Sequence, residues 1–227
     1  MQFPRDTPST VVFDLGGVLV DWDPRYLFRT LLPGEAAVEK FLAEVCTPAW
    51  NAAQDAGRSW ADAVAEASAQ FPDHAELIAA YDERWWETIG GQIDGTVDVL
   101  GELRGRGVML YAVTNWSAEK FDLTYPRFEW LSWFDGIVVS GREQVVKPDP
   151  RIYRILFERY GLDPAATVYV DDAETNVEAA RALGMAGVLF TSPEQLRADL
   201  ERVGVLASGD DGHRRHSSTD EFAEPRP

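Results

Sequence analysis

The chain of 227 residues and 25.3 kDa is long enough for one domain with an insert or for two small domains. Its formal net charge of −17 argues against nucleic acid as a partner, and its three histidines argue against a Ser-His-Asp triad or a multi-histidine metal site. A single cysteine, Cys46, excludes an internal disulfide, and no apolar run reaches the ~18 residues of a membrane span, so we expect a cytoplasmic protein without a membrane partner.

The first strand is expected over about residues 10–15, because Val11, Val12 and Phe13 form an uninterrupted apolar run. Residues 21–91 then show the 3.6-residue spacing of apolar side chains that is typical of helices, and we find no strand there. The helices expected in this stretch cover residues 26–32, 36–45, 60–71 and 75–89. The sequence therefore predicts a helical insert directly after the first strand.

From Gly95 onward, short apolar strands alternate with helices, which is typical of a parallel sheet wrapped by helices. The expected strands cover residues 108–113, 137–139, 167–171 and 188–190, and the expected helices cover residues 96–106, 150–160, 173–183 and 193–203, with one more starting near residue 117. The predicted fold is α/β, a Rossmann-like parallel sheet flanked by helices with an inserted helical domain. The core would comprise residues 1–20 and 92–206, the inserted helical domain residues 21–91, and a polar, disordered tail residues 207–227.

Polar side chains follow several of the expected strands at the point where each strand ends. They are Asp14, then Thr114 with Asn115, then Lys147 in the loop after the third strand, then Asp171 with Asp172. Because the carboxyl ends of parallel strands lie at one edge of the sheet, these side chains should converge there. A carboxylate at the end of a buried strand is costly unless it is paired or bound to a metal, so the convergence indicates an active site.

Four stretches of the chain resemble, in order and spacing, the motifs of the haloacid dehalogenase-like hydrolases. They read FDLGGVL, AVTN, KPDPRIY and VYVDDAETNVEAARALGM. The resemblance covers residues 8–20 and 93–206, and the helical insert lies where that superfamily carries its helical cap. The motif forms are most similar to the branch that includes sugar-phosphate phosphatases and the N-terminal phosphatase domain of soluble epoxide hydrolases.

The resemblance implies a phosphatase that hydrolyses a small phosphorylated metabolite, such as a sugar phosphate, through an aspartyl-phosphate on Asp14. Thr114 would hold a phosphoryl oxygen, Asn115 would extend that support, and Lys147 would offset the negative charge of Asp14 and the phosphoryl group. Covalent catalysis of this kind divides one difficult displacement into two easier steps. The charge of Lys147 is local, which reconciles an anionic substrate with an acidic chain.

The resemblance also implies a Mg²⁺ site. Asp14, Asp172 and the backbone carbonyl of Gly16 would be its ligands, because Mg²⁺ prefers oxygen donors and keeps several waters. Asp171 would hold Lys147 rather than the metal, and Asn176, one helical turn beyond Asp172, would lie in the outer shell.

Position 16 departs from the family pattern. Phosphatases of this superfamily usually have a second aspartate two residues after the nucleophile, and it serves as the general acid and base. Gly16 has no side chain that could carry a proton, and Asp21 and Asp23 are the nearest candidates along the chain to replace it. The sequence therefore leaves the proton donor for the leaving group unassigned.

Gly17, Trp22 and Trp116 lie close to these motifs and are the candidates for substrate contact. The other tryptophans of the insert, Trp50, Trp60, Trp85 and Trp86, are interpreted as packing residues, and Arg25 and Arg58 as surface residues. Two other functions stay open at this stage. One is a metal-independent 2-haloacid dehalogenase with Asp14 as nucleophile, and the other is a catalytically weak binding protein on the same fold. A monomer or a homodimer is expected.

Overall fold

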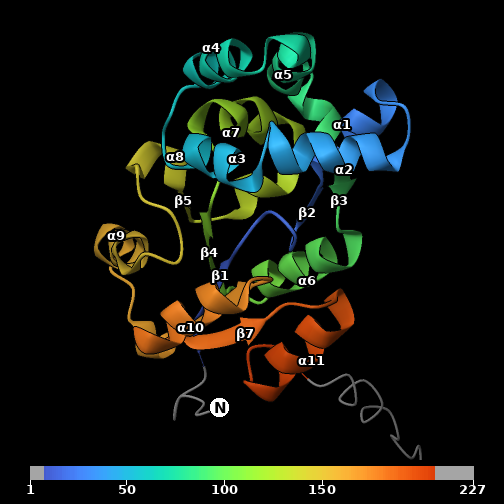
Figure 1. Ribbon diagram of the computed structural model, residues 1–227. Coiled ribbons are helices and arrows are strands. Elements are labelled where there is room, and N and C mark those ends of the chain that lie inside the picture. Colours follow the sequence, from blue (N-terminus) through green and yellow to red (C-terminus); the bar gives the residue numbers. More distant parts are fainter. Residues whose placement is uncertain (1–7, 208–227) are drawn as a thin grey trace, which may run out of the picture.

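A computed structural model describes residues 8–207 and contains one five-stranded parallel sheet with helices on both faces (Figure 1). The strand order is β5-β4-β1-β6-β7, which places β1 at the centre. The strands are β1 (Thr10–Phe13), β4 (Met109–Thr114), β5 (Gly136–Val139), β6 (Thr167–Asp171) and β7 (Ala186–Leu189). This architecture confirms the predicted α/β fold.

Successive side chains of each strand point to opposite faces of the sheet, and both faces are apolar. Val12, Tyr111, Val113 and Tyr169 pack with α9 (Pro150–Tyr160) and α10 (Glu174–Ala182). Their neighbours in the strands face the opposite side, where α6 (Asp94–Gly105) and α11 (Pro193–Arg202) pack. Residues in the middle of β1, β4 and β6 are buried, so the strand ends are the positions where polar side chains can reach a ligand.

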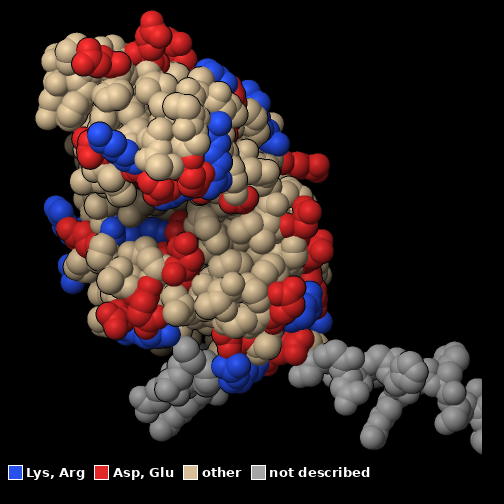
Figure 2. Space-filling model, turned by 45° about the vertical axis from the view of Figure 1, so that its right-hand side comes forward, with Lys and Arg blue, Asp and Glu red and all other residues tan. Residues whose placement is uncertain are grey.

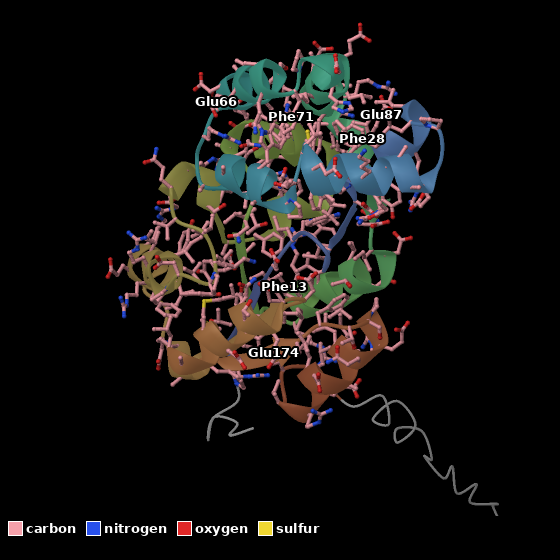
Figure 3. The ribbon with its side chains drawn as sticks, viewed as in Figure 1. Phe13, Phe28, Glu66, Phe71, Glu87 and Glu174 are labelled. Atoms are coloured by element: carbon pink, nitrogen blue, oxygen red, sulfur yellow. The ribbon has the colours of Figure 1, made fainter. Side chains whose placement is uncertain are left out.

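The helices of residues 24–83 lie beyond the carboxyl-end edge of the sheet, and we refer to residues 24–88 as the insert (Figure 1). They are α1 (Pro24–Leu31), α2 (Glu35–Glu44), α3 (Pro48–Asp55), α4 (Trp60–Gln70) and α5 (Ala75–Glu83). Two shorter helices of the core, α7 (Ala118–Thr124) and α8 (Ser140–Glu143), lie next to the insert. Figure 3 shows Phe28 among the helices of the insert, where its ring lies 4.6 Å from Phe41 and 5.3 Å from Tyr81, whereas Phe13 lies in the core.

Short 3₁₀ turns connect several of these elements. They cover Pro72–His74, Trp85–Thr88, Tyr125–Arg127, Glu129–Trp133 and Pro164–Ala166. Among the described residues, no helix is both long and apolar enough to cross a lipid bilayer.

Two predictions for residues 21–91 were wrong. The two connections between core and insert form a small antiparallel sheet of β2 (Val20–Trp22) and β3 (Ile89–Gln92), where no strand was expected. These strands are short, and each is stabilised by a partner about 70 residues away, so neither has a local signal. The helix expected over residues 75–89 ends at Glu83, because Trp85–Thr88 turns into a 3₁₀ helix before β3.

A further helix, α3, was missed. Its boundary signals are present in the sequence: Thr47 accepts a hydrogen bond from the Trp50 N–H, and Pro48 occupies the first turn. Most of the predicted tail, residues 208–227, lies outside the described residues, so its disorder stays a prediction.

Candidate active site

Asp14 directly follows the central strand, and both its backbone and its side chain are held by hydrogen bonds. Its backbone N–H donates to the Val170 carbonyl at 2.8 Å, which continues the pairing of β1 with β6. Its Oδ1 accepts from the Leu15 N–H at 2.7 Å and lies 2.8 Å from Lys147 Nζ. The side chain is buried, and this burial raises the pKa of Asp14 against the opposing effect of the Lys147 charge.

Lys147 connects two carboxylates. Its Nζ lies 2.8 Å from Asp14 Oδ1 and 2.8 Å from Asp171 Oδ2, and the side chain is fully buried. Burial alone would lower the pKa of Lys147, but the two carboxylates outweigh it and raise that pKa, so the amine stays charged. Asn115 fixes the backbone of this residue, because its Oδ1 accepts from the Lys147 N–H at 2.8 Å and its Nδ2 donates to the Lys147 carbonyl at 3.1 Å.

Asp171 is the most heavily bonded carboxylate of the site. Besides Lys147, its oxygens accept from the Tyr169 hydroxyl at 2.5 Å, from Asn176 Nδ2 at 3.0 Å and from the Ala173 N–H at 2.9 Å. Burial favours the neutral acid, but Lys147 and these donors outweigh it and lower the pKa of Asp171. Sequence reasoning missed Tyr169, although its position two residues before Asp171 puts both side chains on one face of β6.

Asp172 is exposed and lies against the loop after Asp14. A Cβ on Gly17 would come within 2.2 Å of Asp172 Oδ2, so the glycine makes room for this carboxylate. One oxygen each of Asp14, Asp171 and Asp172 lie within 4.8 Å of one another. Such a set of hard oxygen donors fits Mg²⁺, and Asp14 and Asp172 are the members with capacity to spare, because Asp171 already accepts four hydrogen bonds.

Thr114 ends β4 beside the central strand and is 1% exposed. Its hydroxyl Oγ1 is buried and has no hydrogen-bond partner among the described residues. An unpaired buried hydroxyl costs free energy, and a ligand oxygen bound at this edge of the sheet would remove that cost. Thr114 therefore has a hydroxyl that is free to bond to a ligand at this edge of the sheet.

A cavity of about 70 Å³ separates the insert from this edge of the sheet. The core contributes Gly16, Asn115, Trp116 and Ser117 to its lining, and the chain entering and forming the insert contributes Trp22, Asn51, Asp55, Trp60 and Trp85. The surface is indented where the insert meets the core (Figure 2). Ligands that reach the strand ends from this side must pass between the two parts.

Four tryptophans line the cavity, and only two of them were expected to contact substrate. Trp22 and Trp116 line the cavity, and the indole N–H of each is buried without a partner among residues 8–207. Trp60 and Trp85 also line the cavity, although they had been interpreted as packing residues only. Gly17, in contrast, does not line it and lies against Asp172. The spacing of an aromatic residue in a helix cannot distinguish a core side chain from one at the border of a cavity.

The arginines of the insert are engaged in ion pairs. Arg25 pairs with Asp23 and Glu39, and Arg58 pairs with Glu66 and donates to Gln54. Lys147 is therefore the cation that the structure places directly at the strand ends.

Comparison with known proteins agrees with this geometry. A sequence model of the haloacid dehalogenase-like hydrolases matches residues 8–184, which is more than half of the chain. The chain belongs to the haloacid dehalogenase-like hydrolases. The resemblance seen in the sequence is thereby confirmed, and the protein is a hydrolase.

Individual relatives of this hydrolase have different activities in their names. A sesquiterpene phosphatase of Aspergillus oryzae is 29% identical over 82% of this chain and 91% of its own. A haloacid dehalogenase-family enzyme of Bacteroides thetaiotaomicron, solved with magnesium and inorganic phosphate, has a TM-score of 0.63 at 22% identity, covering 82% of this chain and 95% of its own. A structure described as a dehalogenase has a TM-score of 0.60 at 19% identity, covering 81% of this chain and 85% of its own. The two structures establish the shared fold.

Ser140 joins the insert of this hydrolase to its core. The buried hydroxyl donates to the Asp55 carbonyl at 2.6 Å and accepts from the Trp116 N–H at 3.0 Å. Replacing Ser140 with alanine leaves both backbone groups without this partner and should lower the free energy of unfolding by about 1–3 kcal/mol. Urea denaturation measures the change. Ser132→Ala is the control, because that exposed hydroxyl bonds only to the nearby Glu129 carbonyl, and it should cost less than about 0.5 kcal/mol. Equal stabilities of the two variants would contradict the expectation.

Proposed function

We propose that this hydrolase is a Mg²⁺-dependent phosphatase that acts on small phosphate monoesters, sugar phosphates among them, through an aspartyl-phosphate on Asp14. The observation that carries the proposal is the pair of 2.8 Å contacts from buried Lys147 to Asp14 and Asp171. A phosphoryl dianion approaches a carboxylate only where fixed positive charge offsets the repulsion. The sesquiterpene phosphatase relative supports the same class of reaction.

Each side chain of the site has a definite part in this proposal. Lys147 and the Leu15 N–H bind Asp14 Oδ1, which leaves Oδ2 as the oxygen that attacks phosphorus. The unpaired Thr114 hydroxyl donates to a phosphoryl oxygen. Asn115 positions Lys147 through its backbone, and Asp171, held by Tyr169 and Asn176, keeps the Lys147 ammonium in place. The insert acts as a cap that encloses the leaving group.

Mg²⁺, held by Asp14, Asp172 and the Gly16 carbonyl, would neutralise the charge of the phosphoryl group when bound. The close approach of Asp172 to Gly17 supports this ligand set, because it aims the carboxylate at the loop that carries Asp14.

Metal dependence separates this proposal from the dehalogenase alternative. We expect hydrolysis of 4-nitrophenyl phosphate to stop after treatment with EDTA and to return when Mg²⁺ is added, because the nucleophile Asp14 is itself one of the proposed metal ligands. The measurement is release of 4-nitrophenol, with release of halide from 2-chloropropionate followed in parallel. Halide release that persists in EDTA would replace the phosphatase with a dehalogenase. Absence of both activities, with phosphate or a phosphate ester still bound, would favour the catalytically weak binding protein.

A further inference from the structure

Gly16 leaves open space beside the nucleophile. A Cβ built on Gly16 would meet no atom within 4 Å, and the residue lines the cavity between core and insert. The structure therefore has room for a proton donor here but no side chain on the core loop to supply one.

The insert brings a carboxyl group to the same cavity. Asp55, the last residue of α3, lines it together with Gly16, Asn115 and Trp116. Its Oδ2 accepts from Asn51 Nδ2 at 3.3 Å, and its backbone carbonyl accepts from the Ser140 hydroxyl at 2.6 Å. The second bond ties the backbone at the end of α3 to the core, so the helix end that carries this carboxyl group is held beside the strand ends.

The two acids that the sequence offered as replacements are engaged elsewhere. Asp21 accepts from the Tyr26 hydroxyl at 2.8 Å, and Asp23 begins α1 by accepting from the Arg25 N–H at 2.8 Å. Neither lines the cavity, whereas Asp55 does.

We propose that Asp55 exchanges a proton with the leaving-group oxygen and so takes the catalytic role that a carboxyl group at position 16 would have. The inference rests on the phosphatase function proposed above. It also implies that catalysis needs the insert in place over the sheet edge, because the proton donor belongs to the insert and the nucleophile to the core.

The surroundings of Asp55 suit this role. Burial raises the pKa of Asp55 to about 7, with a smaller opposing effect from the Ser117 N–H, and a general acid is most effective when its pKa is close to the working pH. No ion pair reaches Asp55 among the described residues. The charged groups on the packed elements have other partners: Arg58 with Glu66, Glu119 with the Trp60 N–H, Arg142 with Asp122, and Glu143 with Arg159.

Asp55 gives up a proton when the aspartyl-phosphate forms and takes one back when it is hydrolysed. In the first, Asp14 Oδ2 forms a bond to phosphorus, the bond from phosphorus to the ester oxygen breaks, and the Asp55 carboxylic acid gives its proton to that oxygen, which leaves as an alcohol. In the second, the Asp55 carboxylate takes a proton from water as the water oxygen bonds to phosphorus and the bond to Asp14 breaks. Asp14 is regenerated as a carboxylate, Asp55 as the acid, and inorganic phosphate is released.

The test compares esters with good and poor leaving groups in the presence of Mg²⁺. For Asp55→Asn we expect kcat/KM for a simple alkyl phosphate to fall about 10²-fold or more, because an alkoxide needs the proton, while kcat/KM for 4-nitrophenyl phosphate changes by less than about threefold. Because water attack also loses its base, 4-nitrophenol should appear in a pre-steady-state burst. Adding Gly16→Asp to this variant should restore at least about tenfold on the alkyl ester. Asp73→Asn, an exposed acid of the insert, is the matched control and should behave as wild type.

Equal losses on both esters would overturn the assignment, because a merely structural role of Asp55 does not depend on the leaving group. A steep fall of log kcat/KM with leaving-group pKa in the wild type would also overturn it, and this measurement needs no variant. Failure of the phosphatase proposal itself is distinguishable, because the wild type would then hydrolyse neither ester with Mg²⁺.

Discussion

Replacing Lys147 with methionine should lower kcat/KM by at least about 10²- to 10³-fold, as expected when a preorganised charge at the reacting group is removed. The same change should lower the free energy of unfolding by about 3–5 kcal/mol, because it leaves two buried carboxylates without their shared cation. Methionine has a similar length and no charge, so packing changes little. Initial rates with 4-nitrophenyl phosphate and urea denaturation measure the two effects.

The stability deficit of Lys147→Met should shrink as the pH falls from about 8 to about 5. Without the lysine, Asp14 and Asp171 repel each other, so the pKa of Asp14 rises further above its unfolded value and the pKa of Asp171 is no longer held below its own. The folded state then binds protons more tightly, so its stability increases toward low pH. In the wild type, Asp171 shows the opposite trend, because its pKa is lowered and its contribution disappears as the pH falls. A deficit that does not change with pH would contradict the repulsion of the two carboxylates.

Two other lysines serve as controls for this variant. Lys40 is exposed, and Lys40→Met should affect neither rate nor stability. Lys120 is buried against Asp82 and the Trp60 ring, so Lys120→Met should cost stability through the loss of a buried cation. A loss of activity in Lys40→Met as large as that in Lys147→Met would show that the effect is not local to the site.

Replacing Gly17 with alanine should weaken Mg²⁺ binding by about 10- to 100-fold, the range typical of changes that displace a metal ligand's support. The new Cβ would lie 2.2 Å from Asp172 Oδ2 and 2.9 Å from its Cγ, so the carboxylate must move away from the loop that carries Asp14. The backbone at position 17 has a φ of +71°, so alanine should also cost about 1–2 kcal/mol of stability. Calorimetric titration with Mg²⁺ and thermal unfolding measure these effects.

Gly161→Ala separates the effect of backbone strain on stability from the effect of displacing Asp172 on Mg²⁺ binding. Gly161 ends α9 with a φ of +67°, and a Cβ there would meet no atom within 4 Å. The two alanine variants should therefore lose similar stability from backbone strain, while only Gly17→Ala should lose affinity for Mg²⁺. Wild-type Mg²⁺ affinity in Gly17→Ala would show that Asp172 does not bind the metal.

The polar positions at the carboxyl edge of the sheet could be predicted from the sequence because each follows an apolar strand. Asp14 directly follows β1, and Asp171 is the last residue of the neighbouring parallel strand β6. The carboxyl ends of neighbouring parallel strands lie together, however long the chain between the two strands is. The bonds of Lys147 to both carboxylates are the consequence. The family could be identified for the same reason, since its motifs lie at these strand ends.

Contributions from the insert could not be predicted in the same way. Asp55 reaches the cavity only because α3 packs beside α8 and because Ser140 bonds to its carbonyl, and neither contact has a local pattern in the sequence. Trp60 and Trp85 have the helical surroundings of core residues and still border the cavity. The pairing of β2 with β3 joins segments about 70 residues apart, so short-range periodicity does not reveal it.

The β2–β3 ribbon determines how the insert can move. Both covalent connections between the two parts run side by side through it and are bonded to each other, so a displacement must bend one paired ribbon instead of two independent linkers. Three polar contacts also span the boundary between the insert and the core, from Ser140 to Asp55, from Trp60 to Ser117 and from Lys120 to Asp82. Opening between the insert and the core would therefore require bending this ribbon and breaking all three contacts.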